Sequence, residues 1–229
     1  AYALDHVLQT LREHYPKPFY EACLNLISSH DIIRAATALS GAPDRNSVSR
    51  KLQAVYQPNE KDQQKGYQRL ILAAALQMTL PGVPSVYYGD EAGMTGMSDP
   101  FNRGTYPWGT ENEAVFAAYS ALMCARAGSD ALKRGLCRMG ALSPESYAIL
   151  RWLPETGEQA VMLINRSERE QRLTLHPDDM PQGPDGETQV TLANELTDVL
   201  TGEANWPENN TMTVALPPLT ARLFLTGTR

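Results

Sequence analysis

The first part of the chain shows the apolar spacing of a helix, then of a short buried strand, then of further helices. Apolar residues at i, i+3, i+4 and i+7 from Leu4 onward predict an amphipathic helix that ends near Pro16. The apolar run 23–27 stops at a polar group, which is typical of a buried strand that opens onto a polar loop. A short helix is predicted at residues 33–39 and a long one at residues 64–79.

A second buried-strand pattern, at residues 83–88, also ends in a polar loop that contains glycine. A further helix with one apolar face is predicted over residues 111–127. Helices and strands therefore alternate, an order typical of βα units whose strands run parallel in one sheet. Residues 40–62 interrupt this order as a long polar excursion after the first strand, and the sequence assigns them no role.

Beyond residue 130 the pattern changes to short alternating or β-branched segments. Strands are predicted at residues 147–153, 159–165, 172–175, 189–192, 211–216 and 221–225. Turn-forming clusters separate several of them, at residues 154–157 and 181–186. This arrangement predicts an antiparallel β-sandwich. We therefore expect two domains, an α/β part over residues 1–130 and an all-β part over residues 131–229.

The composition is that of an ordinary globular protein with an acidic balance. Lys and Arg number 20 against 26 Asp and Glu, which gives a formal charge of −6, and 42% of the residues are hydrophobic. The acidic balance argues against nucleic acid as a partner, because a basic surface would be expected for it. No apolar run approaches the roughly 18–20 residues that a membrane span needs, so no membrane partner is expected either.

The three cysteines, Cys23, Cys124 and Cys137, are widely spaced and have no histidine at ligand spacing. They predict free thiols rather than a disulfide framework or a zinc site, and free thiols favour the cytoplasm over secretion. No acidic loop has EF-hand spacing, so no calcium site can be argued and no cofactor is expected. The chain starts inside a helical pattern without Met, and we expect it to be a piece of a longer protein.

His30 and Asp31 directly follow the first predicted strand. Reactive groups in parallel α/β folds stand where strands end, at the carboxyl edge of the sheet. An imidazole beside a carboxylate can hydrogen-bond a polyol, and the carboxylate can stabilise a developing cation. Taken alone, the same pair also fits a structural role as a satisfied polar pair.

A second ionisable cluster follows the second predicted strand, with Asp90 and Glu91 at the strand end and Asp99 and Arg103 further on. Taken alone, Asp90 and Glu91 fit a loop-ordering pair, and Asp99 and Arg103 fit a surface ion pair of little energetic value. Four aromatic residues lie near the cluster, namely Tyr87, Tyr88, Tyr106 and Trp108. Aromatic faces beside carboxylates and an arginine suit a sugar, and no glycine-rich phosphate loop is present.

Residues 25–31, which read Asn-Leu-Ile-Ser-Ser-His-Asp, resemble the fourth signature segment of the α-amylase family of glycoside hydrolases. Residues 80–94 resemble the seventh segment of that family, around the last barrel strand. Asp99 and Arg103, with Trp108 after them, resemble the branch of neopullulanases, cyclomaltodextrinases and maltogenic amylases. The resemblance implies the last two βα units of a TIM (β/α)8 barrel followed by a C-terminal antiparallel β-sandwich.

The resemblance also implies roles for the residues at matching positions. Asp31 would be the catalytic carboxylate that stabilises the transition state, and His30 would hydrogen-bond the sugar at the cleavage point. Asp99 and Arg103 would bind the neighbouring glucose unit. Supporting roles at the rim and floor would fall to Tyr88, Glu91 and Trp108.

The expected function is thus that of the C-terminal portion of a retaining glycosidase acting on starch, maltodextrin, cyclodextrin or pullulan. The partners implied are an α-glucan oligosaccharide and, for the parent enzyme, a second copy in a homodimer; a calcium ion in the parent is compatible with the resemblance. The nucleophilic and acid/base carboxylates of the family lie upstream, so the 229-residue chain alone is predicted to be inactive. A non-catalytic carbohydrate-binding or structural relative and an α-glucan transglycosylase remain as alternatives.

Overall fold

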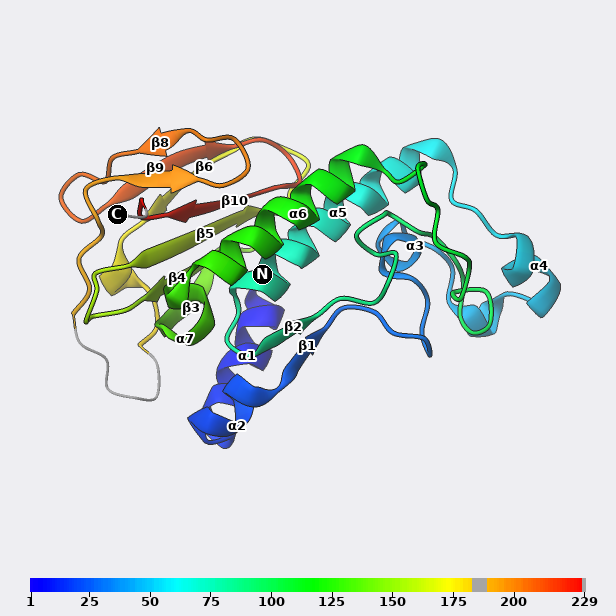
Figure 1. Ribbon diagram of the computed structural model, residues 1–229, viewed down its shortest axis with the longest axis horizontal. Helices are drawn as coiled ribbons and strands as arrows, with labels where there is room; N and C mark the ends of the chain where they lie inside the picture. The colour runs from blue at the N-terminus through cyan, green and yellow to red at the C-terminus, as the bar shows by residue number, and fades with distance from the viewer. Residues whose placement is uncertain (183–188, 228–229) are drawn as a thin grey trace.

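A computed structural model describes residues 1–182 and 189–227 of the chain. Its first part is mainly helical and carries two short strands (Figure 1). The helices are α1 (Tyr2–His14), α2 (Lys17–Ala22), α3 (Ala35–Leu39), α4 (Arg50–Val55), α5 (Glu60–Thr79), α6 (Glu113–Gly128) and α7 (Asp130–Arg134), with a 3-10 turn η1 at Arg45–Ser47. The strands are β1 (Leu24–Leu26) and β2 (Val83–Ser85).

The second part is built from antiparallel strands. They are β3 (Leu136–Ser143), β4 (Ser146–Trp152), β5 (Gln159–Asn165), β6 (Gln171–Leu175), β7 (Leu196–Asp198), β8 (Ala204–Asn205), β9 (Met212–Leu216) and β10 (Thr220–Leu225), with a 3-10 turn η2 at Pro177–Asp179. The larger sheet has the order β3-β4-β5-β10-β7-β8, and β6 pairs with β9 in a second sheet. The expectation of a C-terminal antiparallel sheet domain is confirmed.

The larger sheet is buried on both of its faces. Alternate side chains such as Leu150 and Leu163 face an apolar core shared with β6 and β9. Their neighbours, such as Ile149 and Met162, face a second core built with α5 and α6. The molecule therefore has three layers, with α5 and α6 crossing one face of the sheet (Figure 1). Burial from both sides explains why every residue of β4 and β5 is buried.

The long helices begin where asparagine side chains supply the missing hydrogen-bond partners of the first turn. Asn59 accepts a hydrogen bond from the backbone N–H of Asp62 at 3.0 Å, and Asn112 accepts one from Val115 at the same distance. Gly66, in the middle of α5, lets α3 approach closely, because a Cβ there would lie 2.5 Å from the carbonyl oxygen of Ala36. That contact holds α3 and the residues before it against α5.

The strands β1 and β2 pair in parallel, with Leu24 opposite Val83 and Leu26 opposite Ser85. The expectation that both strands are buried is wrong. Leu24 and Leu26 are 59% and 60% exposed, and Val83 is 47% exposed. The reason is that this sheet has two strands only in the part of the chain that the structure describes, so its outer face has nothing to pack against.

The prediction of a strand at residues 189–192 is also wrong, although the apolar residues of this segment are buried. Val190 and Leu192 are buried in the sandwich core, 3% and 5% exposed. Their backbone bonds to the side chain of Asn210 and not to a strand. Leu192 N donates to Asn210 Oδ1 at 2.7 Å, and Asn210 Nδ2 donates to the carbonyl oxygen of Val190 at 3.3 Å. Of the turn predicted at residues 181–186, only residues 181 and 182 belong to the described part of the chain.

Among the residues described, none of the helices combines the length and the apolar character that crossing a bilayer would require. The same residues contain no group of three or more His, Cys, Asp or Glu side chains placed to hold a metal ion. Cys23, Cys124 and Cys137 are free thiols.

Candidate functional site

The parallel pairing of β1 and β2 brings the two loops that follow them to the same end of the molecule. Asp31, from the first loop, and Asp99, from the second, line one open surface cleft of about 590 Å³. Most of the remaining lining of this cleft comes from the excursion after β1. Its lining residues there are Arg45, Asn46, Val48, Ser49, Arg50 and Gln53. The cleft therefore combines acidic groups from the strand ends with basic groups from the excursion.

The charged groups at the cleft form two exposed pairs. Arg103 Nε lies 2.7 Å from Asp99 Oδ1, and each side chain is about half exposed, at 47% and 51%. His30 Nε2 lies 3.3 Å from Asp31 Oδ1, with both side chains more than half exposed. Ion pairs this accessible contribute little to stability. Each side chain can therefore leave its partner and bind a hydroxyl group of a ligand instead.

A buried ion pair lies directly beneath these loops. Arg34 and Asp90 are 0% and 2% exposed, and the Arg34 guanidinium lies 3.2 Å from Asp90 Oδ1. Ser28 donates a short hydrogen bond to the other carboxylate oxygen. Burial raises the pKa of Asp90, while the hydrogen bond from Ser28 and the charge of Arg34 oppose that rise. Asp90 thus has the loop-ordering role that the sequence left open for it.

Arg34 links three segments that are distant in the sequence. Its guanidinium donates to the carbonyl of Asn102 at 2.8 Å and to the carbonyl of Tyr88. It also lies over two aromatic rings, 4.2 Å from the centroid of Tyr87 and 4.7 Å from that of Tyr88. The loops after β1 and β2 and the loop that carries Asp99 are therefore held by one buried cation.

Asn102 adds further hydrogen bonds between the loop that carries Asp99 and the loop that carries Asp31. Its side-chain amide donates to the carbonyl of Ile32 at 2.6 Å and to the carbonyl of Ser29 at 3.3 Å. The loop with Asp99 and Arg103 is in this way tied to the loop with Asp31. Sequence reasoning singled out neither Arg34, Asn102 nor Ser28 as functional, because nothing in their local pattern marks a buried partner.

His30 and Arg103 do not themselves line this cleft, but they pair with Asp31 and Asp99, which do. The other predicted site residues do not line it either. Tyr88 is partly exposed and donates to the carbonyl of Gly104 at 2.8 Å. Trp108 is 83% exposed, with its ring 4.5 Å from that of Tyr106. Glu91 is partly buried, and one of its carboxylate oxygens is buried without a hydrogen-bond partner.

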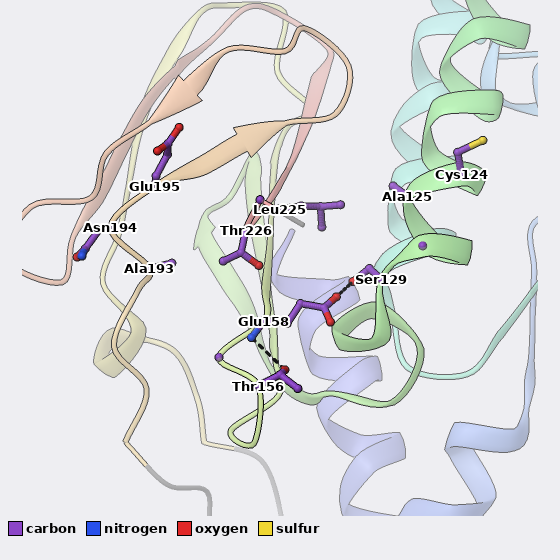
Figure 2. Close-up of a pocket in the computed structure, with 13 residues that line it drawn as sticks. Cys124, Ala125, Ser129, Thr156, Glu158, Ala193, Asn194, Glu195, Leu225 and Thr226 are labelled. Carbon is purple, nitrogen blue, oxygen red and sulfur yellow. Dashed lines mark hydrogen bonds between the residues drawn. The ribbon is translucent and has the colours of Figure 1, made fainter. Parts of the chain in front are cut away.

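The larger hollow of about 940 Å³ lies elsewhere, between the end of α6 and the loop that joins β4 to β5 (Figure 2). None of the predicted site residues lines it. Glu158 there accepts hydrogen bonds from Ser129 Oγ at 2.6 Å and from Ala131 N at 3.1 Å. That carboxylate therefore serves to cap α7, and the candidate site is the smaller cleft at the strand ends.

Solved structures share this fold. An α-amylase from Anoxybacillus matches 98% of the chain with a TM-score of 0.70 and 22% identity, and the match covers 43% of that protein. A cyclic α-maltosyl-(1→6)-maltose hydrolase from Arthrobacter globiformis matches 98% of the chain with a TM-score of 0.66 and 26% identity, over 39% of its length. The chain thus shares the fold of the corresponding part of these two proteins.

Comparison with curated sequences points to the same group of proteins. An amylopullulanase from Thermoanaerobacter thermohydrosulfuricus is 39% identical over 135 residues, which is 58% of this chain and 8% of the relative. A cyclomaltodextrinase from Geobacillus thermopakistaniensis is 30% identical over 217 residues, 94% of this chain and 30% of the relative. No family model matches. The chain belongs to the α-amylase family of glycoside hydrolases, and it spans less than a third of the length of these two relatives.

Proposed function

We propose that this chain is the C-terminal portion of a retaining glycosidase that cleaves α-glucosidic bonds in starch, pullulan or cyclodextrin. The observation that carries the proposal is the cleft shared by Asp31 and Asp99 at the carboxyl ends of two parallel strands. The names of the relatives agree with this substrate class, since they include amylopullulanases, cyclomaltodextrinases and a neopullulanase. Relatives of the same fold have been solved with maltose and with maltotriose.

In this proposal residues 1–130 supply the last two βα units of a (β/α)8 barrel, and residues 131–229 form the C-terminal β-sandwich domain. The units are β1 with α5 and β2 with α6. The exposed outer face of β1 and β2 supports this assignment, because parallel sheets are ordinarily covered on both faces.

Asp31 is the proposed transition-state stabiliser. A carboxylate that grips ring hydroxyls more tightly as the sugar distorts lowers the barrier without attacking the anomeric carbon. His30, paired with it, would bind the same sugar, and Asp99 and Arg103 would bind the next glucose unit. Tyr88, Glu91 and Trp108, which do not line the cleft, would support its rim.

The test is the product of the complete reading frame that contains this chain, assayed on soluble starch, pullulan and cyclodextrin. We expect Asp31→Asn to lower kcat about a thousandfold, since such hydroxyl contacts supply several kcal/mol to the transition state. Asp179→Asn, which changes an exposed acid in the sandwich, is the matched control and should leave kcat unchanged.

Two results would count against the proposal. Absence of turnover by the complete protein on all three glucans, with maltotriose still bound, would identify a non-catalytic carbohydrate-binding relative instead. Equal activity of Asp31→Asn and wild type would remove Asp31 from the catalytic machinery. Analysis of the products at high substrate concentration separates hydrolysis from transglycosylation.

A further inference from the structure

The excursion after β1, to which the sequence assigned no role, is an ordered part of the molecule. Asp44 caps the turn η1 by accepting a hydrogen bond from Asn46 N at 2.7 Å, and Ser49 caps α4 by accepting one from Leu52 N at 3.4 Å. These caps give residues 44–55 a defined path along the edge of the cleft that contains Asp31.

A single buried side chain joins this segment to the loop that carries Asp99. Gln53 is 6% exposed, and its amide donates to the carbonyls of Arg45 at 2.8 Å and Val48 at 2.9 Å. Its carbonyl oxygen accepts a hydrogen bond from Ser98 Oγ at 3.4 Å. Gln53 therefore ties the excursion to the loop that carries Asp99.

Arg50 makes a second link between the excursion and the loop that carries Asp99. It donates to the backbone carbonyl of Asp99 at 2.8 Å, and its guanidinium carbon lies 5.0 Å from the centroid of the Phe101 ring. This double contact holds a cation beside the Asp99 loop. Both Arg50 and Arg45 line the cleft together with Asp31 and Asp99.

We propose that Arg45 and Arg50 bind sugar hydroxyls beside Asp31 and Asp99 in this cleft, and that Gln53 positions the segment that carries the two arginines. The inference rests on the proposed function, whose site it extends. A hydroxyl group both donates and accepts hydrogen bonds, so carboxylates and guanidinium groups that line the same cleft can satisfy both roles at once.

The experiment measures KM and kcat of the complete protein on maltotriose and soluble starch for Arg50→Ala, Arg50→Lys and Arg45→Ala. We expect each alanine variant to raise KM about tenfold with kcat within about twofold of wild type, because a charged hydrogen bond to bound sugar is lost. Arg50→Lys keeps a cation with N–H donors but loses the planar guanidinium, and should recover part of the loss. Lys51→Ala, an exposed neighbour of equal charge that does not line the cleft, is the control and should match wild type.

Gln53→Leu tests the positioning role, since it keeps the approximate volume and removes the three hydrogen bonds. It should raise KM with a thermal unfolding midpoint that stays well above the assay temperature. Arginine variants with wild-type KM, in a protein that Asp31→Asn inactivates, would overturn this inference and leave the proposed function intact. A complete protein without glucan activity or glucan binding would overturn both.

Discussion

Arg34 and Asp90 form an ion pair that is almost completely removed from solvent. Each partner has additional hydrogen bonds, from Ser28 to the carboxylate and from the guanidinium to two backbone carbonyls. Such bonds are what a buried pair needs to offset the loss of hydration. At the scale of single residues, this pair holds together the loops that carry Asp31 and Asp99.

Replacement of Arg34 by methionine is expected to lower the free energy of unfolding by about 3–5 kcal/mol, since it leaves a buried carboxylate without its partner. The measurement is urea denaturation followed by circular dichroism. Arg134→Met is the control, because Arg134 forms ion pairs with Asp130 and Glu155 at the surface, and it should unfold close to wild type. Equal effects of the two substitutions would contradict the role given to Arg34.

The cost of Arg34→Met should also depend on pH. Burial raises the pKa of Asp90, and the loss of the arginine removes a charge that opposes this rise. Because the pKa of Asp90 is raised in the folded state, protonation of Asp90 at low pH favours the folded state. This contribution to the free energy of unfolding is lost as the pH rises through the folded-state pKa. The variant should therefore differ less from wild type at about pH 4 than at about pH 7. A difference that is constant over this range would exclude Asp90 as the cause.

At the scale of elements, the β1–β2 pair depends on one side chain of α5. Gln77 is 3% exposed and donates to the carbonyl of Asn25 at 2.7 Å and to that of Ser85 at 2.8 Å. It thereby fixes both strands to the helix that covers their inner face. Their outer side chains are exposed and so add little apolar packing.

Gln77→Leu removes both of these hydrogen bonds while keeping the side-chain volume nearly constant. We expect a loss of about 2 kcal/mol, from two bonds of about 1 kcal/mol each, and faster hydrogen exchange in β1 and β2. Gln64→Leu, at an exposed position of the same helix, serves as the control. Unchanged exchange in both strands would show that other contacts hold the pair.

At the scale of the whole molecule, one apolar core crosses the proposed boundary between the α/β part and the sandwich. Leu70 and Leu122 of the helices are fully buried together with Ile149 and Leu223 of the larger sheet. Separation of the two parts would expose this surface to water, at a cost of roughly 25 cal/mol per Å² of apolar area. The two parts are therefore expected to stabilise each other.

This shared core predicts a single cooperative unfolding transition in urea. Fluorescence should report mainly on Trp152, which is 4% exposed, whereas Trp108 and Trp206 are 83% and 65% exposed. Circular dichroism at 222 nm would follow the helices of the first part. The two signals should coincide over the transition, and helices that melt before the Trp152 signal changes would contradict the shared core.

The local pattern of the chain was enough to place several elements correctly. The helix predicted at residues 64–79 is α5 from Glu60, and the strand predicted at residues 159–165 has those bounds in β5. Both follow from the spacing of apolar residues over a few turns or pleats, which is a local property. The His-Asp and Asp-Arg pairs could likewise be found by their places after predicted strands.

The sequence by itself thus determined the type and order of most elements, because apolar periodicity acts over neighbouring residues. The tertiary structure decided which groups became partners across the fold. It placed Arg34 against Asp90, Gln53 against Ser98 and the excursion beside Asp31. The first two pairings join residues more than 40 positions apart, and only the packing of the whole chain sets the path of the backbone between them.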